Sequence, residues 1–454
     1  MPTHFHRYIP HTPEDIRQML DRIGASTVEE LFESIPESIR RNGDINLPPP
    51  LAEQDLMKEL ARLAGENTPS DHPASFLGGG IYDHHVPPAL DQIVGRSEFY
   101  TAYTPYQAEI SQGTLQGIYE FQTLVCQLLG MEVANASVYD GASAAAEAVL
   151  MARRISRGRS RFLIGSNVHP QYRQVIRTYT ANFDIDIQEV PYGKDGRIDG
   201  AKLDKMLSDE VAGVLVQSPN YFGCVEDLQA VSEKARRSGA LVIVTFSEPL
   251  AYALLAPPGK FGADIACGEG QSLGIPMSYG GPHVGLFASK KSYIRNLPGR
   301  LCGRTEDREG RTGYVLTLAT REQHIRREKA TSNICTNQAL CALRNAVYLT
   351  LMGKNCLRKL AASNLSLAQY AKGALTGKGG AELVFGAPTF NEFVLRVPGE
   401  AAGVLASLQH KGILGGIDLG AAGYAELSDC MLVSVTEKNT KEEIDRYAEE
   451  LGSL

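Results

Sequence analysis

Residues that could bind an anion gather at the start of a predicted helix. The stretch Tyr139–Ser143 (YDGAS) directly precedes a helix expected over 144–157. Here Gly141, Ala142 and Ser143 offer backbone amides and a hydroxyl at a helix amino terminus, which can receive a phosphate group. An ordinary capped helix, with Ser143 or Asp140 as its cap, fits the same residues. The sequence leaves both interpretations open.

A segment rich in tyrosine carries a second concentration of polar side chains. Its phenols, amides and single carboxylate provide more hydrogen-bonding capacity than a loop needs for its own turns. We therefore expect a role in an interface or in a site formed between subunits, with simple packing inside an interface as the alternative. The residues are Tyr100, Tyr103, Thr104, Tyr106, Gln107, Glu109 and Gln112.

Basic side chains form a third cluster further along the chain. Guanidinium and imidazole groups at such spacing suit a carboxylate, a phosphate or an acidic partner surface. A solvated helix face is the competing interpretation. The cluster consists of Arg321, His324, Arg326, Arg327 and Lys329.

The elements expected to position these residues alternate between helices and strands. A long amphipathic helix begins at Thr114 and ends near Gly130, and another helix covers 227–238. Short apolar runs between such helices predict a mainly parallel sheet covered on both faces, that is, an α/β fold. The predicted strands are Arg161–Gly165, Asp186–Val190, Gly213–Gln217, Leu241–Phe246, Asp264–Cys267 and Val284–Ala288.

The amino-terminal region has a different pattern. Thr12, Pro13 and Asp15 predict a capped helix that Gly24 ends, the first part of a small helical arm. The triplet Gly78-Gly79-Gly80 then opens a long ordered loop region, rich in Tyr, Gly and Pro, through Gly113.

The carboxy-terminal region mixes helices and strands. A long helical stretch follows Asn333, strands are expected near Glu392–Val397 and Met431–Val435, and a last helix begins at Lys441. We therefore expect three parts. They are an arm and interface segment over 1–113, a large α/β domain over 114–330 and a small α+β domain over 331–454.

Bulk composition excludes several classes of protein. The net charge of −7, from 52 acidic and 45 basic side chains, gives no broad positive field for nucleic acid. The chain has no apolar run of the roughly 18 residues that a membrane helix requires. Its eight cysteines lie scattered without a C-x-x-C pair, which favours buried thiols in a reducing cytoplasm and no metal site.

Three features together resemble the fold of aspartate-aminotransferase-like pyridoxal-phosphate enzymes (fold type I). One is the helix start at Gly141. Another is His169, just beyond strand 161–165, where enzymes of this fold commonly place a ring over the cofactor. The third is the segment after strand 264–267, where the position of the Schiff-base lysine holds Gln271, which cannot form an imine. Beyond strand 241–246, Glu248 stands where the fold places an aspartate opposite the pyridine nitrogen.

On this resemblance the cofactor contacts at Gly141, Ala142, Ser143, His169 and Glu248 are vestigial. The neighbouring lysines do not replace the missing one. Lys260 precedes the relevant strand, and Lys290 and Lys291 follow the next strand.

Longer stretches resemble one family, the glycine decarboxylase P-protein. Phe76–Ala148 (FLGGGIYDHH onward) is similar to its most characteristic region, and Gly268–Ala288 and Thr320–Leu340 reinforce the similarity. The absent lysine points to the first subunit of a P-protein split into two polypeptides, as in many bacteria. The resemblance implies a second subunit that binds pyridoxal phosphate.

The resemblance also implies that the pair decarboxylates glycine and passes the aminomethyl group to the lipoyl arm of H-protein. This chain then has no catalytic residue of its own and binds no cofactor covalently. Two alternatives stay open. One is an autonomous pyridoxal-phosphate enzyme of the aminotransferase fold, and the other is a non-catalytic structural paralogue.

Overall fold

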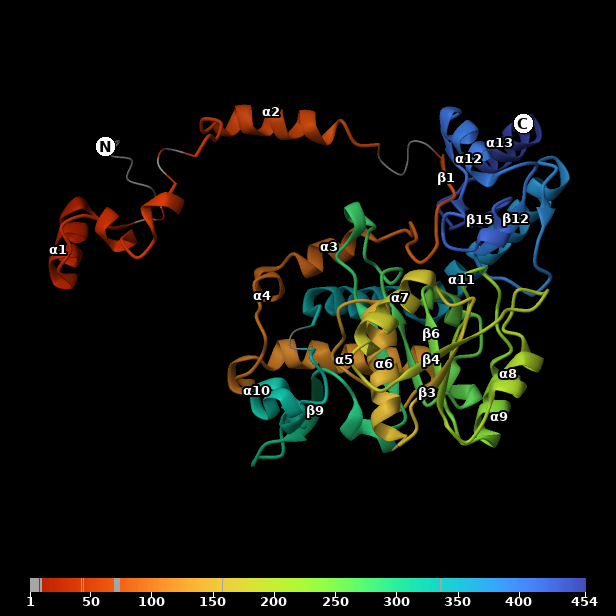
Figure 1. Cartoon of the computed structure of the whole chain (residues 1–454), viewed down its shortest axis with the longest axis horizontal. Helices are drawn as coiled ribbons and strands as arrows, with labels where there is room; N and C mark the ends of the chain where they lie inside the picture. The colour runs from red at the N-terminus through yellow and green to blue at the C-terminus, as the bar shows by residue number, and fades with distance from the viewer. Residues whose placement is uncertain are drawn as a thin grey trace. The chain divides into compact units, whose positions relative to one another are not determined.

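The chain divides into two compact units, Met1–Asn67 and Thr68–Leu454. The computed structural model describes residue 8 and residues 10–41, 43, 45–68, 74–156, 158–334 and 337–454 (Figure 1). The finer division into three parts expected from the sequence stays a prediction. No helix within the described ranges is long and apolar enough to cross a membrane.

The first unit contains short helices, and none of its described residues belongs to a hydrophobic core. Helix α1 (Pro13–Ile23) has the predicted capping box, since Asp15 N donates to the Thr12 hydroxyl and Thr12 N donates to the Asp15 carboxylate. It ends at Gly24 in the left-handed conformation, with φ +78°. The 3₁₀ helix η1 (Glu29–Phe32) comes next, followed by η2 (Glu37–Ile39) and α2 (Glu53–Ala64). In the described residues 13–23 and 53–64 no side chain is buried.

The second unit is built around a seven-stranded sheet with strand order β2-β8-β7-β6-β5-β3-β4. The five strands from β3 to β7 pair in parallel, and β8 and β2 continue one edge antiparallel. The predicted strands are confirmed, with shifts of one or two residues at β5, β7 and β8. Their bounds are β2 Val133–Ala134, β3 Arg161–Gly165, β4 Asp186–Val190, β5 Val211–Gln217, β6 Leu241–Phe246, β7 Ile265–Glu269 and β8 Gly285–Ser289.

Helices cover both faces of this sheet, because successive strand side chains point to opposite sides. Phe162 and Ile164 of β3 pack into one cluster with α6 and α7, whereas Leu163 packs into another with α5, α8, α9 and α11. Figure 1 shows α6 lying across the strands. The helices are α3 Pro88–Val94, α4 Ser97–Tyr100, α5 Gln112–Leu129, α6 Gly141–Ile155, α7 Pro170–Thr180, α8 Gly200–Met206, α9 Leu228–Arg237, α10 Gln323–Arg326 and α11 Ala339–Gly377.

A smaller sheet with strand order β11-β12-β15-β14 forms a separate core with α12, α13 and the end of α11. In Figure 1 this part is blue and lies at one edge of the large sheet. Residues 74–76 contact this smaller part of the unit, because β1 pairs with β13. The elements are β1 Ala74–Ser75, β11 Glu382–Leu383, β12 Glu392–Arg396, α12 Ala401–His410, β13 Ile413–Leu414, β14 Ile417–Asp418, β15 Cys430–Ser434 and α13 Lys441–Gly452.

Two regions differ from the sequence-based expectation. The stretch from Gly78 to Gly113 includes α3 and α4 as well as loop. The hairpin of β9 (Leu301–Glu306) and β10 (Thr312–Thr317) was not expected, because its largely polar sequence lacks the apolar alternation of a strand. Short 3₁₀ helices complete the unit: η3 Ala108–Ile110, η4 Pro249–Ala253, η5 Pro258–Phe261, η6 Ser278–Gly280, η7 Lys291–Asn296, η8 Ala319–Arg321, η9 Arg327–Lys329 and η10 Ala425–Leu427.

Candidate functional site

The amino terminus of α6 is a capped helix end whose first amides already bind carboxylates. Asp140 is the cap, and its Oδ1 accepts from Ser143 N at 2.7 Å. Gly141 N donates to Glu269 Oε2 at 2.9 Å. The two amides that a bound phosphate would use at Gly141 and Ser143 therefore serve groups of the chain itself.

Glu269, the last residue of β7, supplies the carboxylate that binds the first amide of α6. Its Oε1 accepts from Gly270 N at 3.0 Å, from Gln271 N at 3.1 Å and from Val284 N at 3.1 Å. The residue is only 4% exposed. A β-carbon at Gly141 would lie 2.0 Å from the Tyr172 hydroxyl, so the helix end is also tightly packed.

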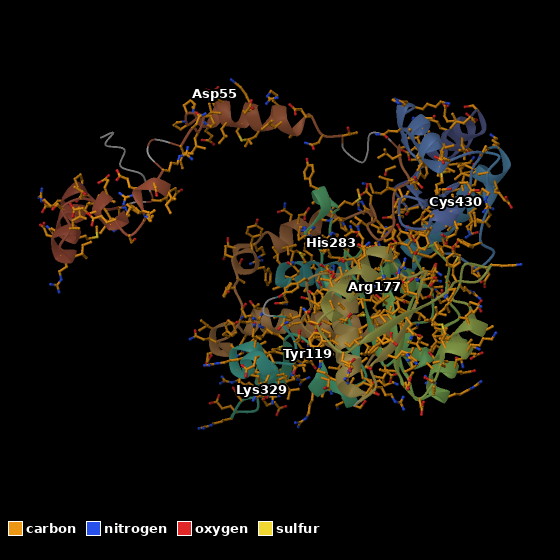
Figure 2. The ribbon with its side chains drawn as sticks, in the orientation of Figure 1. Asp55, Tyr119, Arg177, His283, Lys329 and Cys430 are labelled. Atoms are coloured by element: carbon orange, nitrogen blue, oxygen red, sulfur yellow. The ribbon has the colours of Figure 1, made fainter. Side chains whose placement is uncertain are left out.

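His283 lies beside this carboxylate and is labelled in Figure 2. Its Nδ1 is 3.6 Å from Glu269 Oε1. The interaction with Glu269 raises the pKa of His283, against the opposing effect of partial burial. A cavity bordered by Gly80, Asp140, Gln171, Glu269 and His283 opens at this point.

His169 faces the chain's own backbone. Its Nε2 lies 2.7 Å from the carbonyl oxygen of Gly79, and its Nδ1 accepts from Gln171 N at 3.2 Å. Burial lowers the pKa of His169 to about 4, so the ring is neutral and Nε2–H is the donor to Gly79. The ring stacks on Tyr172, with centroids 4.9 Å apart.

Gln271, in the position of the absent lysine, binds a backbone segment from the other end of the sequence. Its Oε1 accepts from Tyr82 N at 3.0 Å, and its Nε2 donates to Tyr82 O at 3.0 Å and to Ile275 O at 2.7 Å. The residue is 1% exposed. A lysine ammonium has no acceptor and could not bind Tyr82 N.

Glu248 pairs with a buried histidine. His84 Nε2 lies 2.8 Å from Glu248 Oε2, and His84 Nδ1 lies 2.8 Å from Glu437 Oε2. Burial alone would lower the pKa of His84, but the charges and hydrogen bonds of the two carboxylates outweigh it and raise that pKa to about 10. Burial likewise disfavours the charged form of Glu437, yet the bond to His84 and the neighbouring donors lower its pKa to about 2. The three side chains form a triad in which His84 and Glu248 are buried.

The segment Gly78–His85 thus contacts His169, Gln271 and Glu248, the predicted cofactor positions other than the start of α6. It passes between the large and the small sheet, which explains its glycines. A β-carbon at Gly78 would lie 2.4 Å from Ser434 Cβ, and one at Gly79, where φ is +69°, would lie 2.5 Å from Ile417 Cδ1. The Glu392 carboxylate also holds this segment in place, since it accepts from Gly79 N at 2.6 Å and from the Tyr82 hydroxyl at 2.8 Å.

These residues do not fit pyridoxal phosphate. Glu269 and Asp140 hold the anion-binding amides, the amide of Gln271 replaces an amine, and the Gly78–His85 segment has taken the hydrogen-bonding groups of His169, Gln271 and Glu248. The structure brings the predicted residues His169, Glu248 and Gln271 together around the Gly78–His85 segment. The sequence did not reveal Tyr82 and His84, for which the only local signal was the glycine triplet, nor Glu269 and Glu437, which have no such signal.

The tyrosine-rich segment is, by contrast, largely exposed. The exposed fraction is 67% for Tyr100, 81% for Tyr103 and 57% for Tyr106. Gln107 and Glu109 are exposed, and Thr104 is half-buried. Two of the predicted residues have internal partners. The Tyr106 hydroxyl accepts from Arg300 Nη2 at 3.0 Å, and Gln112 forms two 2.9 Å hydrogen bonds with the backbone of Tyr314.

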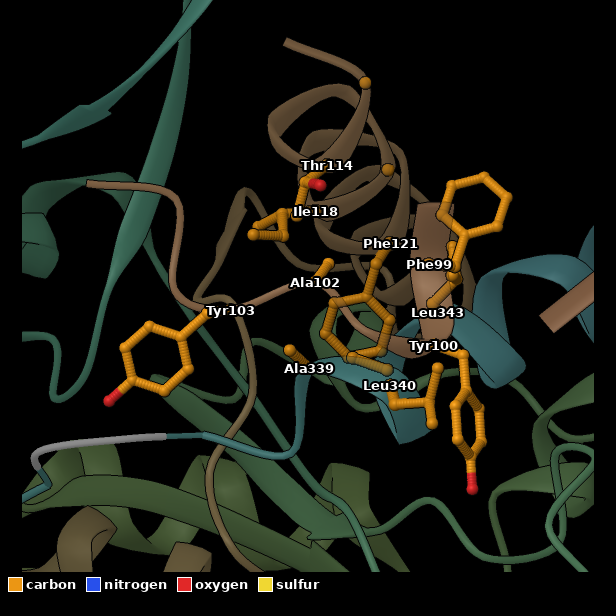
Figure 3. A pocket seen from close by; sticks show the side chains of 13 residues that line it. Phe99, Tyr100, Ala102, Tyr103, Thr114, Ile118, Phe121, Ala339, Leu340 and Leu343 are labelled. Carbon is orange, nitrogen blue, oxygen red and sulfur yellow. The ribbon is translucent and has the colours of Figure 1, made fainter. Parts of the chain in front are cut away.

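An apolar groove lies between this segment, α5 and α11. Its wall includes Phe99, Ile118, Phe121, Leu340 and Leu343. Figure 3 shows the rings of Tyr100 and Tyr103 on either side of Phe121, with their hydroxyl oxygens turned away from it. We call this surface the aromatic groove.

The basic cluster divides into a buried and an exposed part. Arg321 is 7% exposed, and its guanidinium donates to the carbonyls of Leu318, Leu297 and Gly299. Burial lowers the pKa of Arg321. His324, Arg326, Arg327 and Lys329 are exposed and keep the predicted positive surface. Figure 2 labels Lys329.

Comparison with known proteins decides the family. The model of the glycine cleavage system P-protein family matches residues 6–451. This chain belongs to the glycine cleavage system P-protein family. It is 50% identical over 447 residues to a probable glycine dehydrogenase (decarboxylating) subunit 1 of Anoxybacillus flavithermus, covering 98% of this chain and 99% of that protein. The protein of the same description from Geobacillus kaustophilus is 51% identical over 448 residues, with the same coverage.

Solved structures agree with the family and with the fold. The crystal structure of an inhibitor-bound glycine decarboxylase (P-protein) superimposes with a TM-score of 0.90 at 43% identity, covering 99% of this P-protein chain and 100% of that chain. A NifS-like protein shares the fold alone, with a TM-score of 0.61 at 14% identity over 84% of this chain and 98% of that one. The predicted aspartate-aminotransferase-like fold is confirmed.

Proposed function

We propose that this chain is the first subunit of a two-subunit glycine decarboxylase and that a second subunit of similar fold holds the pyridoxal phosphate. The observation that carries the proposal is Gln271, whose amide is engaged with Tyr82 where a Schiff-base lysine would have to stand. The curated relatives bear the name subunit 1, and they match almost the whole chain. We place the complex in the cytoplasm.

The reaction of the complex is the decarboxylation of glycine with transfer of the aminomethyl group to the lipoyl arm of H-protein. Pyridoxal phosphate in the second subunit supplies the electron sink for loss of the carboxylate. This chain forms no covalent bond to it. Its contribution is to complete the neighbouring site and to hold the second subunit in place.

The aromatic groove and its rim are the surface that we assign to the second subunit. Exposed tyrosines around an apolar centre are typical of the anchoring residues of protein interfaces. Tyr103 and Tyr100 are the most exposed tyrosines of that rim. Tyr103, Tyr106 and Glu109 are the groups of the segment that we expect to position glycine or the lipoyl arm.

The exposed basic residues give the complex a second recognition surface. Arg326, Arg327 and Lys329 are exposed and positively charged, with the exposed His324 beside them, whereas internal carbonyl bonds occupy Arg321. A carboxylate of glycine or an acidic face of H-protein has the complementary charge.

Reconstitution tests the proposal directly. The isolated chain, incubated with pyridoxal phosphate and reduced with borohydride, should yield no pyridoxyl-lysine peptide. Mixed with the second subunit, lipoylated H-protein and glycine, it should form a stable hetero-complex and restore decarboxylation that neither subunit shows alone. A pyridoxyl group on Lys260, Lys290 or Lys291 would favour an autonomous enzyme. A second subunit that is fully active without this chain would favour a structural paralogue.

A further inference from the structure

We infer that groups of the chain itself occupy the polar contacts by which this fold holds its cofactor. The Glu269 carboxylate takes the place of the phosphate at the amino terminus of α6, and the Gly78–His85 segment engages the polar groups that would surround the ring. The missing lysine is then one of three coupled changes. Restoring it alone leaves the other two occupants in the pocket.

The first part of the argument is the convergence of amides on Glu269. Its four amide partners come from three separate places in the chain: the start of α6, the loop after β7 and the residue before β8. Amides that converge in this way at a helix amino terminus form an anion site. Here the anion is a side chain, and Asp140 adds a second carboxylate at the same helix end. A phosphate placed there would meet both.

The second part is the fit of the Gly78–His85 segment. Both backbone polar groups of Tyr82 bind Gln271, its hydroxyl binds Glu392, and the residue is 0% exposed. Two positions further on, His84 binds Glu248 and Glu437. If the segment left, Glu248, Glu392 and Glu437 would each lose a buried partner at once, which strongly opposes its release.

The third part is access. The cavity at Asp140, Glu269 and His283 is also lined by Ala142, His169, Gly79 and Gly80, so it reaches both the Glu269 carboxylate and one face of the Gly78–His85 segment. A small anion can therefore reach the amides of α6 once the Glu269 side chain is shortened. The hydrogen-bonding groups of Gln271 and Glu248 stay occupied, because their contacts with the Gly78–His85 segment do not involve Glu269.

The phosphate position is tested with Glu269→Ala in the full-length chain. Its four amides lose their acceptor, so its melting temperature should fall, and inorganic phosphate should raise it again with a saturating dose dependence. At about ten times the dissociation constant we expect a rise of roughly 1–2 °C. The wild type should show no rise beyond that given by chloride of equal ionic strength. Calorimetric titration with phosphate supplies an independent measurement.

The matched control is Glu226→Ala. Glu226 is also a buried carboxylate that accepts from a backbone amide, Ile198 N, but it lies away from α6. This variant should also lose stability and should gain nothing from phosphate. Phosphate binding by the wild type, or an equal phosphate response in Glu269→Ala and Glu226→Ala, would overturn the assignment of Glu269.

The ring position is tested with Gln271→Lys and with hydrogen exchange. The Gln271→Lys variant should show no imine absorbance with pyridoxal phosphate, and a readily formed imine would mean that the pocket is open. In the wild type, the amides of Gly79 and Tyr82 should exchange slowly with or without pyridoxal phosphate. Exchange as fast as that of the exposed residues around Tyr279 would also refute the inference, and this measurement needs no variant.

Discussion

Two polar regions that follow each other in the sequence have opposite fates in the structure. In the Gly78–His85 segment, Tyr82 and His84 are buried. The backbone and hydroxyl of Tyr82 and both ring nitrogens of His84 have partners within the chain. The segment from Tyr100 to Glu109 leaves three tyrosines more than half exposed beside an apolar groove. The first region is used within the subunit, and the second is available to a partner.

A high density of polar residues therefore does not by itself mark a site. Gln112 and Arg321, both candidates from the sequence, bind backbone groups of the same chain. Exposure and unused hydrogen-bonding capacity separate residues that serve the fold from residues that serve a partner. Changes in the buried region should therefore affect stability, and changes in the exposed region should affect assembly or turnover.

The largest effect should come from His84→Leu. This change leaves Glu248 and Glu437 buried without their shared cation, and loss of one partner from a buried charged group costs about 3–5 kcal/mol. Urea denaturation measures it. His85→Leu is the matched control, because His85 is exposed and its contact with Glu437 is made by its backbone. Equal stability of the two variants would show that the triad does not anchor the segment.

The second effect concerns pH and Glu392. Burial raises the pKa of Glu392 from 4.5 to about 7. Because the folded pKa is raised, the contribution of Glu392 to stability is fully present below pH 4.5 and is lost as pH rises to 7, by on the order of 3 kcal/mol. In Glu392→Gln this contribution to the pH dependence should disappear, since the amide still accepts from Gly79 N and donates to the Tyr82 hydroxyl. Unfolding free energies of both proteins at pH 4.5 and 7.5 test this prediction. If the variant changes in stability between these pH values as much as the wild type does, groups other than Glu392 cause the pH dependence.

The third effect belongs to the exposed region. Tyr103→Ala should reduce glycine decarboxylation by the reconstituted complex by on the order of 100-fold, with little change in folding. We expect the same direction for Tyr106→Ala and Glu109→Gln. Turnover at saturating second subunit is measured together with the affinity between subunits. Phe183→Ala, another exposed aromatic residue, is the control. Loss of affinity with normal turnover would make the segment an assembly element only.

The smallest effect should follow from Arg326→Ala combined with Lys329→Ala. Exposed charges mainly steer association, so the association rate with the partner should fall roughly two- to fivefold at low salt, and this difference should vanish at high salt. Arg308→Ala changes an exposed arginine on the β9–β10 hairpin and serves as the control. A loss that persists at high salt would indicate direct contact instead of steering.

Much of the fold follows from local patterns. The strands from β3 to β8 are short apolar runs between turn residues, and α1 and α13 begin at capping boxes that a few neighbouring residues define. The cap of α6 by Asp140 is equally local. The absence of the imine lysine is visible from the position of Gln271 after a strand.

Local patterns along the chain are therefore enough to predict the fold, the family resemblance and the missing lysine. Which groups contact Gln271 and Glu248 follows instead from the packing of distant segments. Tyr82 and Gln271 are 189 positions apart, and His84 and Glu437 are 353 apart. Such pairs have no periodicity or spacing along the chain, because they arise where the packing of two sheets brings distant segments together. The same holds for Glu269, which looks like an ordinary strand end until the start of α6 packs against it.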